Sequence, residues 1–226
     1  MLGIAAAGVV ARRQRDERTM TRDQRFRLTL AAVGGAILGA YLLELPADLL
    51  GWSAPAPAGA LGDDAPLGGR TVLGGILGGW LGVEAIKPRL AIRFPTGDAF
   101  ALPLAIALAF GRTGCLLAGC CAGVECAPSA LAWHDARGTP RVPVQAIEIL
   151  FHGLAAGVLF VAARRGSARG RRLAIYVTGY AALRFGLESW RPHPRVIAGL
   201  SWYQVLAIAL ASLGAVTWWR RRGSAW

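Results

Sequence analysis

The sequence predicts an all-α protein, a polytopic bundle of about six transmembrane helices with both termini in the cytoplasm. Of its 226 residues, 54% are hydrophobic and only 17% are charged, whereas soluble domains carry about 25% charged residues. Six apolar stretches approach the roughly 20 residues that a helix needs to cross a bilayer. Basic residues gather in alternate connections between these stretches. Together these observations leave little room for a soluble core.

The six predicted spans follow one another in a single membrane domain, 1–226. A basic cytoplasmic segment, 1–27, precedes the bundle at 28–219, and a short basic tail, 220–226, follows it. The apolar run Met1 to Ala11 is too short to span, and its charges come after it, unlike those of a secretory signal. A remnant of an earlier helix and a wrongly assigned start both remain open. The predicted spans are Leu28 to Leu45, Gly68 to Ile86, Ala99 to Ala118, Val142 to Ala163, Leu173 to Trp190 and Gly199 to Trp219.

The net charge of +12 comes mainly from four basic clusters. Loops rich in lysine and arginine stay in the cytoplasm, and the loop from Pro46 to Leu67 contains neither residue. The alternation therefore places the N-terminus inside and the C-terminus inside after six spans. The charge indicates topology, and we expect no nucleic-acid partner. The clusters are the seven arginines from Arg12 to Arg27, Lys87 with Arg89 and Arg93, the five arginines from Arg164 to Arg172, and Arg220 to Arg222.

Glycines recur every fourth residue in the second predicted span, at Gly74, Gly78 and Gly82. Faces of small residues at this spacing let membrane helices approach closely. Close packing is enough to explain them. A backbone surface that lines a lipid headgroup cavity is the alternative.

Four cysteines fall within twelve positions at the outer end of the third predicted span: Cys115, Cys120, Cys121 and Cys126. Their C-x4-C-C-x4-C spacing is not a standard zinc spacing, so we predict no metal site. A disulfide in an oxidising periplasm and small polarizable packing residues both remain open.

A carboxylate and an amide follow Pro143 at the start of the fourth span, as Glu148 and Gln145. A buried carboxylate with no cation on its own helix needs a partner from another helix. Arg112, at the end of the third span, is the candidate. The sequence therefore predicts a pair between Arg112 and Glu148.

The fifth span carries Arg184, Glu188 and Arg191 at positions i, i+4 and i+7. This spacing places them on one helical face, which Tyr180 extends by a turn. Guanidinium groups bind phosphate through two parallel hydrogen bonds, so the stripe predicts an anion site. A purely structural ion-pair ladder is the alternative. Glu44 and Glu84 lie near span ends, and we expect both to reach water.

Several motifs in this order resemble those of the prolipoprotein diacylglyceryl transferase family. Gln204 sits where that family carries a glutamine at the start of its last helix, and the glycine run from Gly68 to Gly79 is similar to its His-Gly-Gly region. The other matching motifs are Gly111-Arg112-Thr113-Gly114, Gly119-Cys120-Cys121-Ala122-Gly123, Pro143-Val144-Gln145-Ala146-Ile147-Glu148, and Arg184-Phe185 with Glu188 and Arg191-Pro192.

The sequence departs from the family pattern at several positions. Leu73 stands where the family places a histidine, Val142 replaces the histidine of the proline motif, and Cys115 replaces an asparagine found in many members. The chain contains no asparagine. Family members usually have seven spans, and the first is missing or reduced here to Met1 to Ala11. The family's proposed general base is thus absent.

The resemblance implies transfer of the diacylglyceryl group of phosphatidylglycerol to a cysteine thiol of a prolipoprotein signal peptide, in the plasma (inner) membrane of a bacterium. Membrane lipid and that signal peptide would be its partners, and it implies no cofactor. Arg112 and Arg184 would bind the lipid phosphate, while Glu148 and Glu188 would hold their guanidinium groups. The further substrate-binding candidates are Gln145, Arg191 and Gln204.

Other functions remain open. A non-catalytic relative that binds anionic phospholipid would explain the lost histidine, and a small transporter is a third possibility. Glu148, or the cationic site alone, would have to ionise the thiol. His134 and His193 lie in predicted external loops, far from an obvious role, and His152 lies deeper in its span, where it caps or packs.

Overall fold

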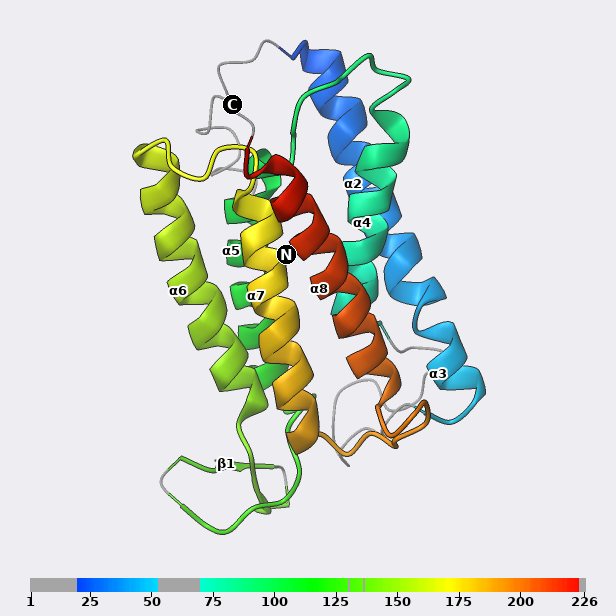
Figure 1. The fold of residues 1–226 in the computed structure, drawn as a ribbon. Coiled ribbons are helices and arrows are strands. Elements are labelled where there is room, and N and C mark those ends of the chain that lie inside the picture. The colour runs from blue at the N-terminus through cyan, green and yellow to red at the C-terminus, as the bar shows by residue number, and fades with distance from the viewer. Residues whose placement is uncertain (1–19, 53–69, 130, 136, 224–226) are drawn as a thin grey trace.

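A computed structural model describes residues 20–52, 70–129, 131–135 and 137–223 (Figure 1). The run Met1 to Ala11, most of the N-terminal basic segment and most of the loop from Pro46 to Leu67 therefore lie outside the described residues. Within the described ranges, each of the six predicted spans forms a helix.

The described part of the chain is mostly helical, and two short strands in it pair as an antiparallel hairpin. Two shorter elements, α3 (Leu45–Leu49) and the 3-10 helix η1 (Glu188–Trp190), follow α2 and α7. The strands are β1 (Trp133–His134) and β2 (Pro140–Arg141). The longer helices are α2 (Arg22–Leu42), α4 (Val72–Ile86), α5 (Asp98–Leu117), α6 (Val144–Arg164), α7 (Arg172–Leu187) and α8 (Trp202–Arg221).

Four helical segments in the described ranges are long and apolar enough to cross a membrane: Arg22–Leu49, Asp98–Leu117, Val144–Arg164 and Trp202–Arg221. Helices α4 and α7 are shorter, at 15 and 16 residues. The outward faces are apolar, as lipid requires. On α6, for example, Leu150, Leu154 and Val158 are each more than 60% exposed.

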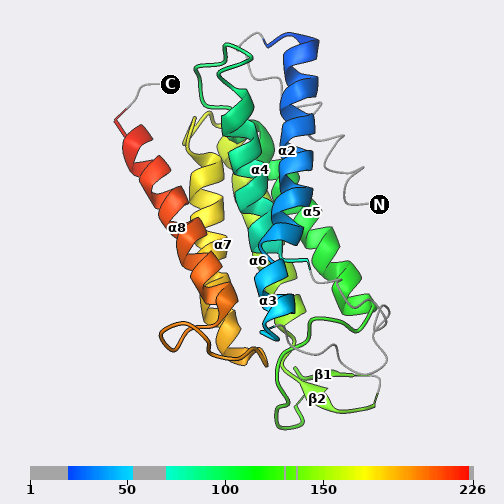
Figure 2. The same cartoon turned by 90° about the vertical axis from the view of Figure 1, so that its right-hand side faces the viewer.

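Helices α2 and α4 lie side by side along their length (Figures 1 and 2). A Cβ atom added at Gly39 or Gly78 would collide with backbone of the facing helix. Because only glycine fits, the two backbones can pack in direct contact. The glycine repeat of the sequence is thereby explained as a packing surface.

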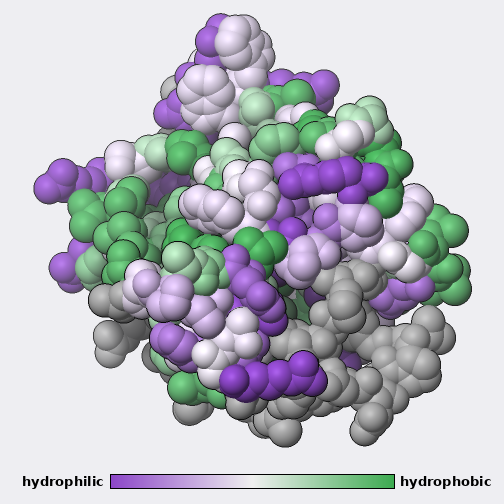
Figure 3. Space-filling model, turned by 90° about the horizontal axis from the view of Figure 1, so that it is seen from below, coloured by the Kyte–Doolittle hydropathy of each residue, from purple (hydrophilic) through white to green (hydrophobic). Residues whose placement is uncertain are grey.

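The basic connections gather at one end of the bundle. The start of α2, the end of α4, the α6–α7 connection and the end of α8 all lie at the top of Figure 1. The β-hairpin and the α7–α8 connection lie at the other end. Seen from that end, hydrophilic side chains lie among hydrophobic ones (Figure 3). We call it the hairpin end, and the candidate site lies there.

Candidate functional site

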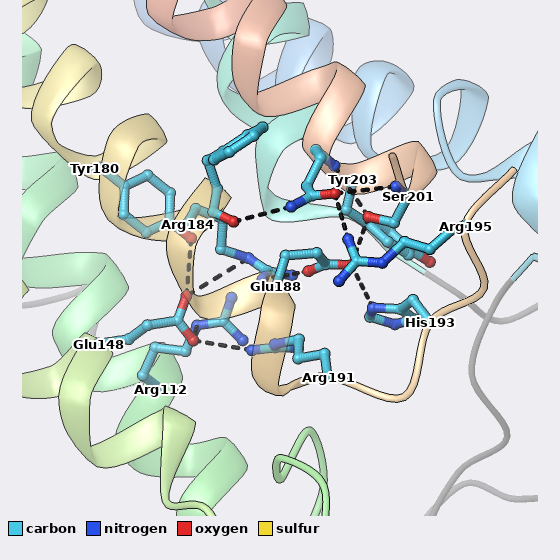
Figure 4. Close-up of polar contacts among 12 residues, drawn as sticks. Arg112, Glu148, Tyr180, Arg184, Glu188, Arg191, His193, Arg195, Ser201 and Tyr203 are labelled. Atoms are coloured by element: carbon cyan, nitrogen blue, oxygen red, sulfur yellow. Dashed lines mark hydrogen bonds and ion pairs between the residues drawn. The ribbon is translucent and has the colours of Figure 1, made fainter. Parts of the chain in front are cut away.

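Five buried charged side chains meet near the hairpin end, where α5 ends, α6 begins and α7 ends (Figure 4). Each is less than 10% exposed. Charged groups at this depth of a membrane protein are costly and usually serve a function. The five are Arg112, Glu148, Arg184, Glu188 and Arg191, which we call the arginine cluster.

Glu148 lies at the centre of the cluster and is fully buried. Its Oε2 lies 3.1 Å from Nε of Arg112 and 3.1 Å from Nη2 of Arg191. Its Oε1 lies 3.8 Å from Nε of Arg184 and accepts a 3.2 Å hydrogen bond from the hydroxyl of Tyr180. The predicted pair between Arg112 and Glu148 is confirmed, and Glu148 also holds two further cations.

Glu188 forms the second centre, at the start of η1. Its Oε2 accepts a 2.8 Å hydrogen bond from Nη1 of Arg184, which confirms the predicted pair. Its Oε1 accepts a 2.8 Å bond from the hydroxyl of Ser201 and lies 2.6 Å from Nδ1 of His193. The carboxylate therefore joins α7 to the following loop and to the start of α8.

Arg191 does not continue the helical face, contrary to the prediction. Helix α7 ends at Leu187, and Arg191 has an extended backbone with φ −113° and ψ 145°. The residue before a proline is disfavoured in the helical region, and Pro192 follows. As a result Arg191 pairs with Glu148 instead of extending the ladder beyond Glu188.

The cluster holds more positive charge than its carboxylates neutralise. Three guanidinium groups face two carboxylates, and Nε of Arg191 has no hydrogen-bond partner among the described residues, whereas Nε of Arg112 meets Glu148 in the 3.1 Å ion pair. Burial, followed by the charge of Arg184, lowers the pKa of Arg191, while Glu148 raises it. An unpartnered buried donor beside surplus positive charge suits an anion with several oxygens, such as a phosphate.

The two glutamines of the predicted site occupy different positions. Gln145 donates a 2.7 Å hydrogen bond from Nε2 to the carbonyl of Cys120, and its Oε1 has no partner among the described residues. Gln204 caps α8 together with Ser201, and its Oε1 also accepts a hydrogen bond from Arg195. Gln145 thus has an oxygen free, whereas Gln204 is engaged in the local structure.

Glu44 and Glu84 were both expected to reach water, and only Glu84 does, while Ser201 was not predicted as a site residue. Glu44 was expected to reach water, but it is 4% exposed and accepts a hydrogen bond from the hydroxyl of Tyr203. The role of Ser201 at the start of α8 could have been predicted, since a serine three residues before a glutamine is a helix-start signal. Glu84 meets the expectation of solvent access, with 44% of its side chain exposed and a 3.1 Å pair to Lys87.

The hairpin beside the cluster is held by its own polar contacts. Nε of Arg141 lies 2.7 Å from Oδ2 of Asp135, and this hydrogen bond is the main cause of a lowered pKa at Asp135. The amide of Gly123 donates to the carbonyl of Val142, and a Cβ at Gly123 would lie 2.8 Å from the carbonyl of Trp190. The loop after α5 therefore packs against the start of α6 and the end of η1.

Comparison with known proteins shows the family of this chain. A family model described as prolipoprotein diacylglyceryl transferase matches residues 1–220. The chain is 29% identical over 206 residues to phosphatidylglycerol–prolipoprotein diacylglyceryl transferase 2 of Clostridium perfringens, covering 88% of this chain and 79% of the relative. It is also 29% identical over 201 residues to the corresponding transferase of Clostridium tetani, covering 86% and 79%. This chain belongs to the prolipoprotein diacylglyceryl transferase family.

Proposed function

We propose that this chain transfers the diacylglyceryl group of phosphatidylglycerol to the lipobox cysteine thiol of a prolipoprotein signal peptide. Relatives named for this reaction support the assignment. The observation that carries it is the arginine cluster, in which three buried guanidinium groups face two carboxylates. Such a cluster is suited to a lipid phosphate at the bundle end.

The cluster would act on the phosphate as the leaving group. The thiolate sulfur forms a bond to the glyceryl carbon, the bond from that carbon to the phosphate oxygen breaks, and its electron pair leaves with glycerol phosphate. Negative charge therefore builds on the phosphate. Arg112 and Arg184 would stabilise that charge, and removal of one such donor typically lowers kcat about 10²–10³-fold. Glu148 and Glu188 would fix the guanidinium groups in place.

The thiol also needs a proton acceptor, because the thiolate is the nucleophile and a free thiol has a pKa of about 8.5. Glu148 is a poor candidate, since three arginines and Tyr180 surround it. Of the three histidines, His152 is fully buried and bonds Tyr176 through Nδ1, 2.9 Å away. His134 lies in the hairpin strand β1.

His193 has the geometry of a base. Its Nδ1 lies 2.6 Å from Glu188 Oε1, and no hydrogen bond to its Nε2 is found in the described part of the chain. A carboxylate at Nδ1 favours the tautomer with the proton there, which leaves Nε2 free to accept one. Glu188 also holds Arg184, so a single carboxylate would connect the base to a phosphate-binding group. We assign thiol deprotonation to His193.

The membrane arrangement supports the same function. We place the protein as a single multi-pass domain of six spans in the bacterial plasma membrane, with both termini in the cytoplasm. The described basic connections share one end of the bundle and the site lies near the other, as a site on the outer side requires. The short helices α4 and α7 would also cross the membrane, with the other helices of the bundle packed around them.

One observation favours a second function. Leu73 stands at the position of the family histidine and is 1% exposed in the hydrophobic core. A relative that binds anionic phospholipid without catalysis would need no base there. If His193 is not a base, this binding role is the better assignment.

One experiment separates the two functions. Purified protein is incubated with phosphatidylglycerol and a lipobox peptide, and the peptide mass is measured. Transfer predicts the mass of the diacylglyceryl thioether. Phospholipid that copurifies with the protein, without any product under conditions where a known family member is active, would support the binding role and contradict the transfer.

The role of His193 is tested by His193→Gln, which keeps an amide donor but removes the base. With the cysteine peptide we expect about a 10²-fold fall in kcat, within the range for general base catalysis. With a selenocysteine peptide, whose selenol ionises without help, the variant should regain most of the wild-type rate. An equal defect with both peptides would show that His193 is structural.

A further inference from the structure

Three of the four cysteines come together beside the arginine cluster. Cys115 lies in the last turn of α5, and Cys120 and Cys121 follow in the turn after it. Their Sγ atoms all lie within 4.8 Å of one another. Each side chain is partly exposed and carries a free thiol. Cys126 is not part of this group.

The backbone is bent so that the three sulfurs face one another. Gly119 and Cys121 both have positive φ angles, 72° and 62°, which reverse the chain direction after the helix. The amide of Cys120 donates a 3.1 Å hydrogen bond to the carbonyl of Cys115. The carbonyl of Cys120 accepts the 2.7 Å bond from Gln145. Both backbone polar groups of Cys120 are therefore hydrogen-bonded, which fixes the turn.

Positive charge lies beside this group. Arg112, which is on the same helix as Cys115, and Arg191 both act electrostatically on Cys121. Thiolates are the form in which cysteines bind metals. The nearby arginines would also offset the negative charge of a site with several thiolates.

The geometry excludes one of the three possible disulfides and is close to that of a three-sulfur metal site. Neighbouring Cα atoms across a trans peptide are 3.8 Å apart, shorter than the roughly 4.4–6.8 Å of disulfides, which excludes a bond between Cys120 and Cys121. With metal–sulfur bonds of about 2.3 Å, three sulfurs in a plane around one ion lie about 4.0 Å apart. The cluster would contract by less than about 1 Å to reach that arrangement.

We propose that Cys115, Cys120 and Cys121 form a three-sulfur binding site for a soft metal ion, Cu(I). Structural zinc sites use four protein ligands, and the described residues place no fourth cysteine, histidine or carboxylate in this group. Soft thiolate ligands favour Cu(I) as well as zinc, and Cu(I) is assigned here because the group lacks the fourth ligand of a structural zinc site. Binding releases the thiol protons to solvent, and the loaded site, three thiolates and one Cu(I), carries two negative charges next to Arg112 and Arg191. The spacing along the sequence did not predict this site because a turn, rather than a helix or hairpin, brings the sulfurs together.

The test is titration of the reduced protein in detergent with Cu(I), without oxygen, against a chromogenic Cu(I) chelator. We expect one Cu(I) per chain to be retained. Cys115→Ser, Cys120→Ser and Cys121→Ser should each weaken retention at least tenfold, while the matched variant Cys126→Ser should bind like the wild type. X-ray absorption of the loaded protein should show three sulfur neighbours around copper.

Three results would overturn the proposal. The first is no retention by the wild type, and the second is equal retention by all four serine variants. The third is a thiol count, made on protein purified without reductant, that shows two of the three clustered thiols joined in a disulfide. None of these results depends on transferase activity, so a failure here leaves the proposed function untouched.

Discussion

Glu148→Gln tests whether one buried carboxylate organises the arginine cluster. The substitution keeps the size of the side chain but removes its charge from the centre of three guanidinium groups, whose nitrogens lie 3.1, 3.1 and 3.8 Å from its oxygens. Removing one partner of a buried ion pair costs about 3–5 kcal/mol, because the other charge stays buried without compensation. For a chain of this size, that loss lowers the melting temperature by on the order of 10 °C.

Glu84→Gln is the matched control. Glu84 also pairs with a cation at 3.1 Å, but 44% of its side chain is exposed, and exposed pairs are worth about 0–1 kcal/mol. Thermal unfolding of both variants in the same detergent gives the comparison. If Glu148→Gln melts within a degree or two of Glu84→Gln, Glu148 does not hold the cluster together and the reasoning fails.

Two other predictions concern the scaffold. Gly78→Ala places a methyl group against the backbone of α2 and should lower the free energy of unfolding by about 1–3 kcal/mol. Gly34→Ala, where the added carbon meets nothing within 4 Å, should leave stability unchanged. Equal melting temperatures of the two variants would contradict the close packing. The pKa of Asp135 is lower in the folded protein than in the unfolded chain. The stabilisation that its charge gives the folded hairpin is therefore fully present above the ordinary aspartate pKa of about 3.9, and it is lost as the pH falls through the lower folded value. The protection factors of the Arg137 and Thr139 amides, which donate to Asp135, should therefore fall in acid. The protection factor is the ratio of the intrinsic to the observed hydrogen-exchange rate. In Asp135→Ala, which removes the acceptor, both factors should be low at every pH, and a pH-independent protection factor in the wild type would refute this.

The length of the apolar stretches and the alternation of the basic loops between them were enough to predict the helices. Each of the six apolar stretches became a helix, with ends shifted by a few residues: the span predicted from Leu28 to Leu45 is the helix Arg22–Leu42. The shift has a local cause, since Thr21 and Gln24 form a capping box that starts α2 before the apolar run. The pairs Arg112–Glu148 and Arg184–Glu188 were also predictable, because a buried carboxylate requires a cation.

Contacts set by loops and chain reversals were not predictable. Arg191 leaves the helical face because Pro192 follows it, and its partner Glu148 lies 43 residues away. His193 reaches Glu188 only because the chain leaves α7 through η1. Glu44 is buried by Tyr203, 159 residues further along the chain. No periodic pattern in a single sequence encodes such contacts.

The central claim, that the arginine cluster binds the lipid phosphate while charge builds on it, is tested most directly by transfer kinetics. The rate of thioether formation is measured against phosphatidylglycerol concentration for Arg112→Ala, Arg184→Ala and Arg137→Ala, the last an exposed arginine next to the hairpin strands. We predict that kcat falls about 10²–10³-fold in each of the first two variants and is unchanged in the third, with all three folded. Wild-type kcat in either Arg112→Ala or Arg184→Ala would contradict the claim.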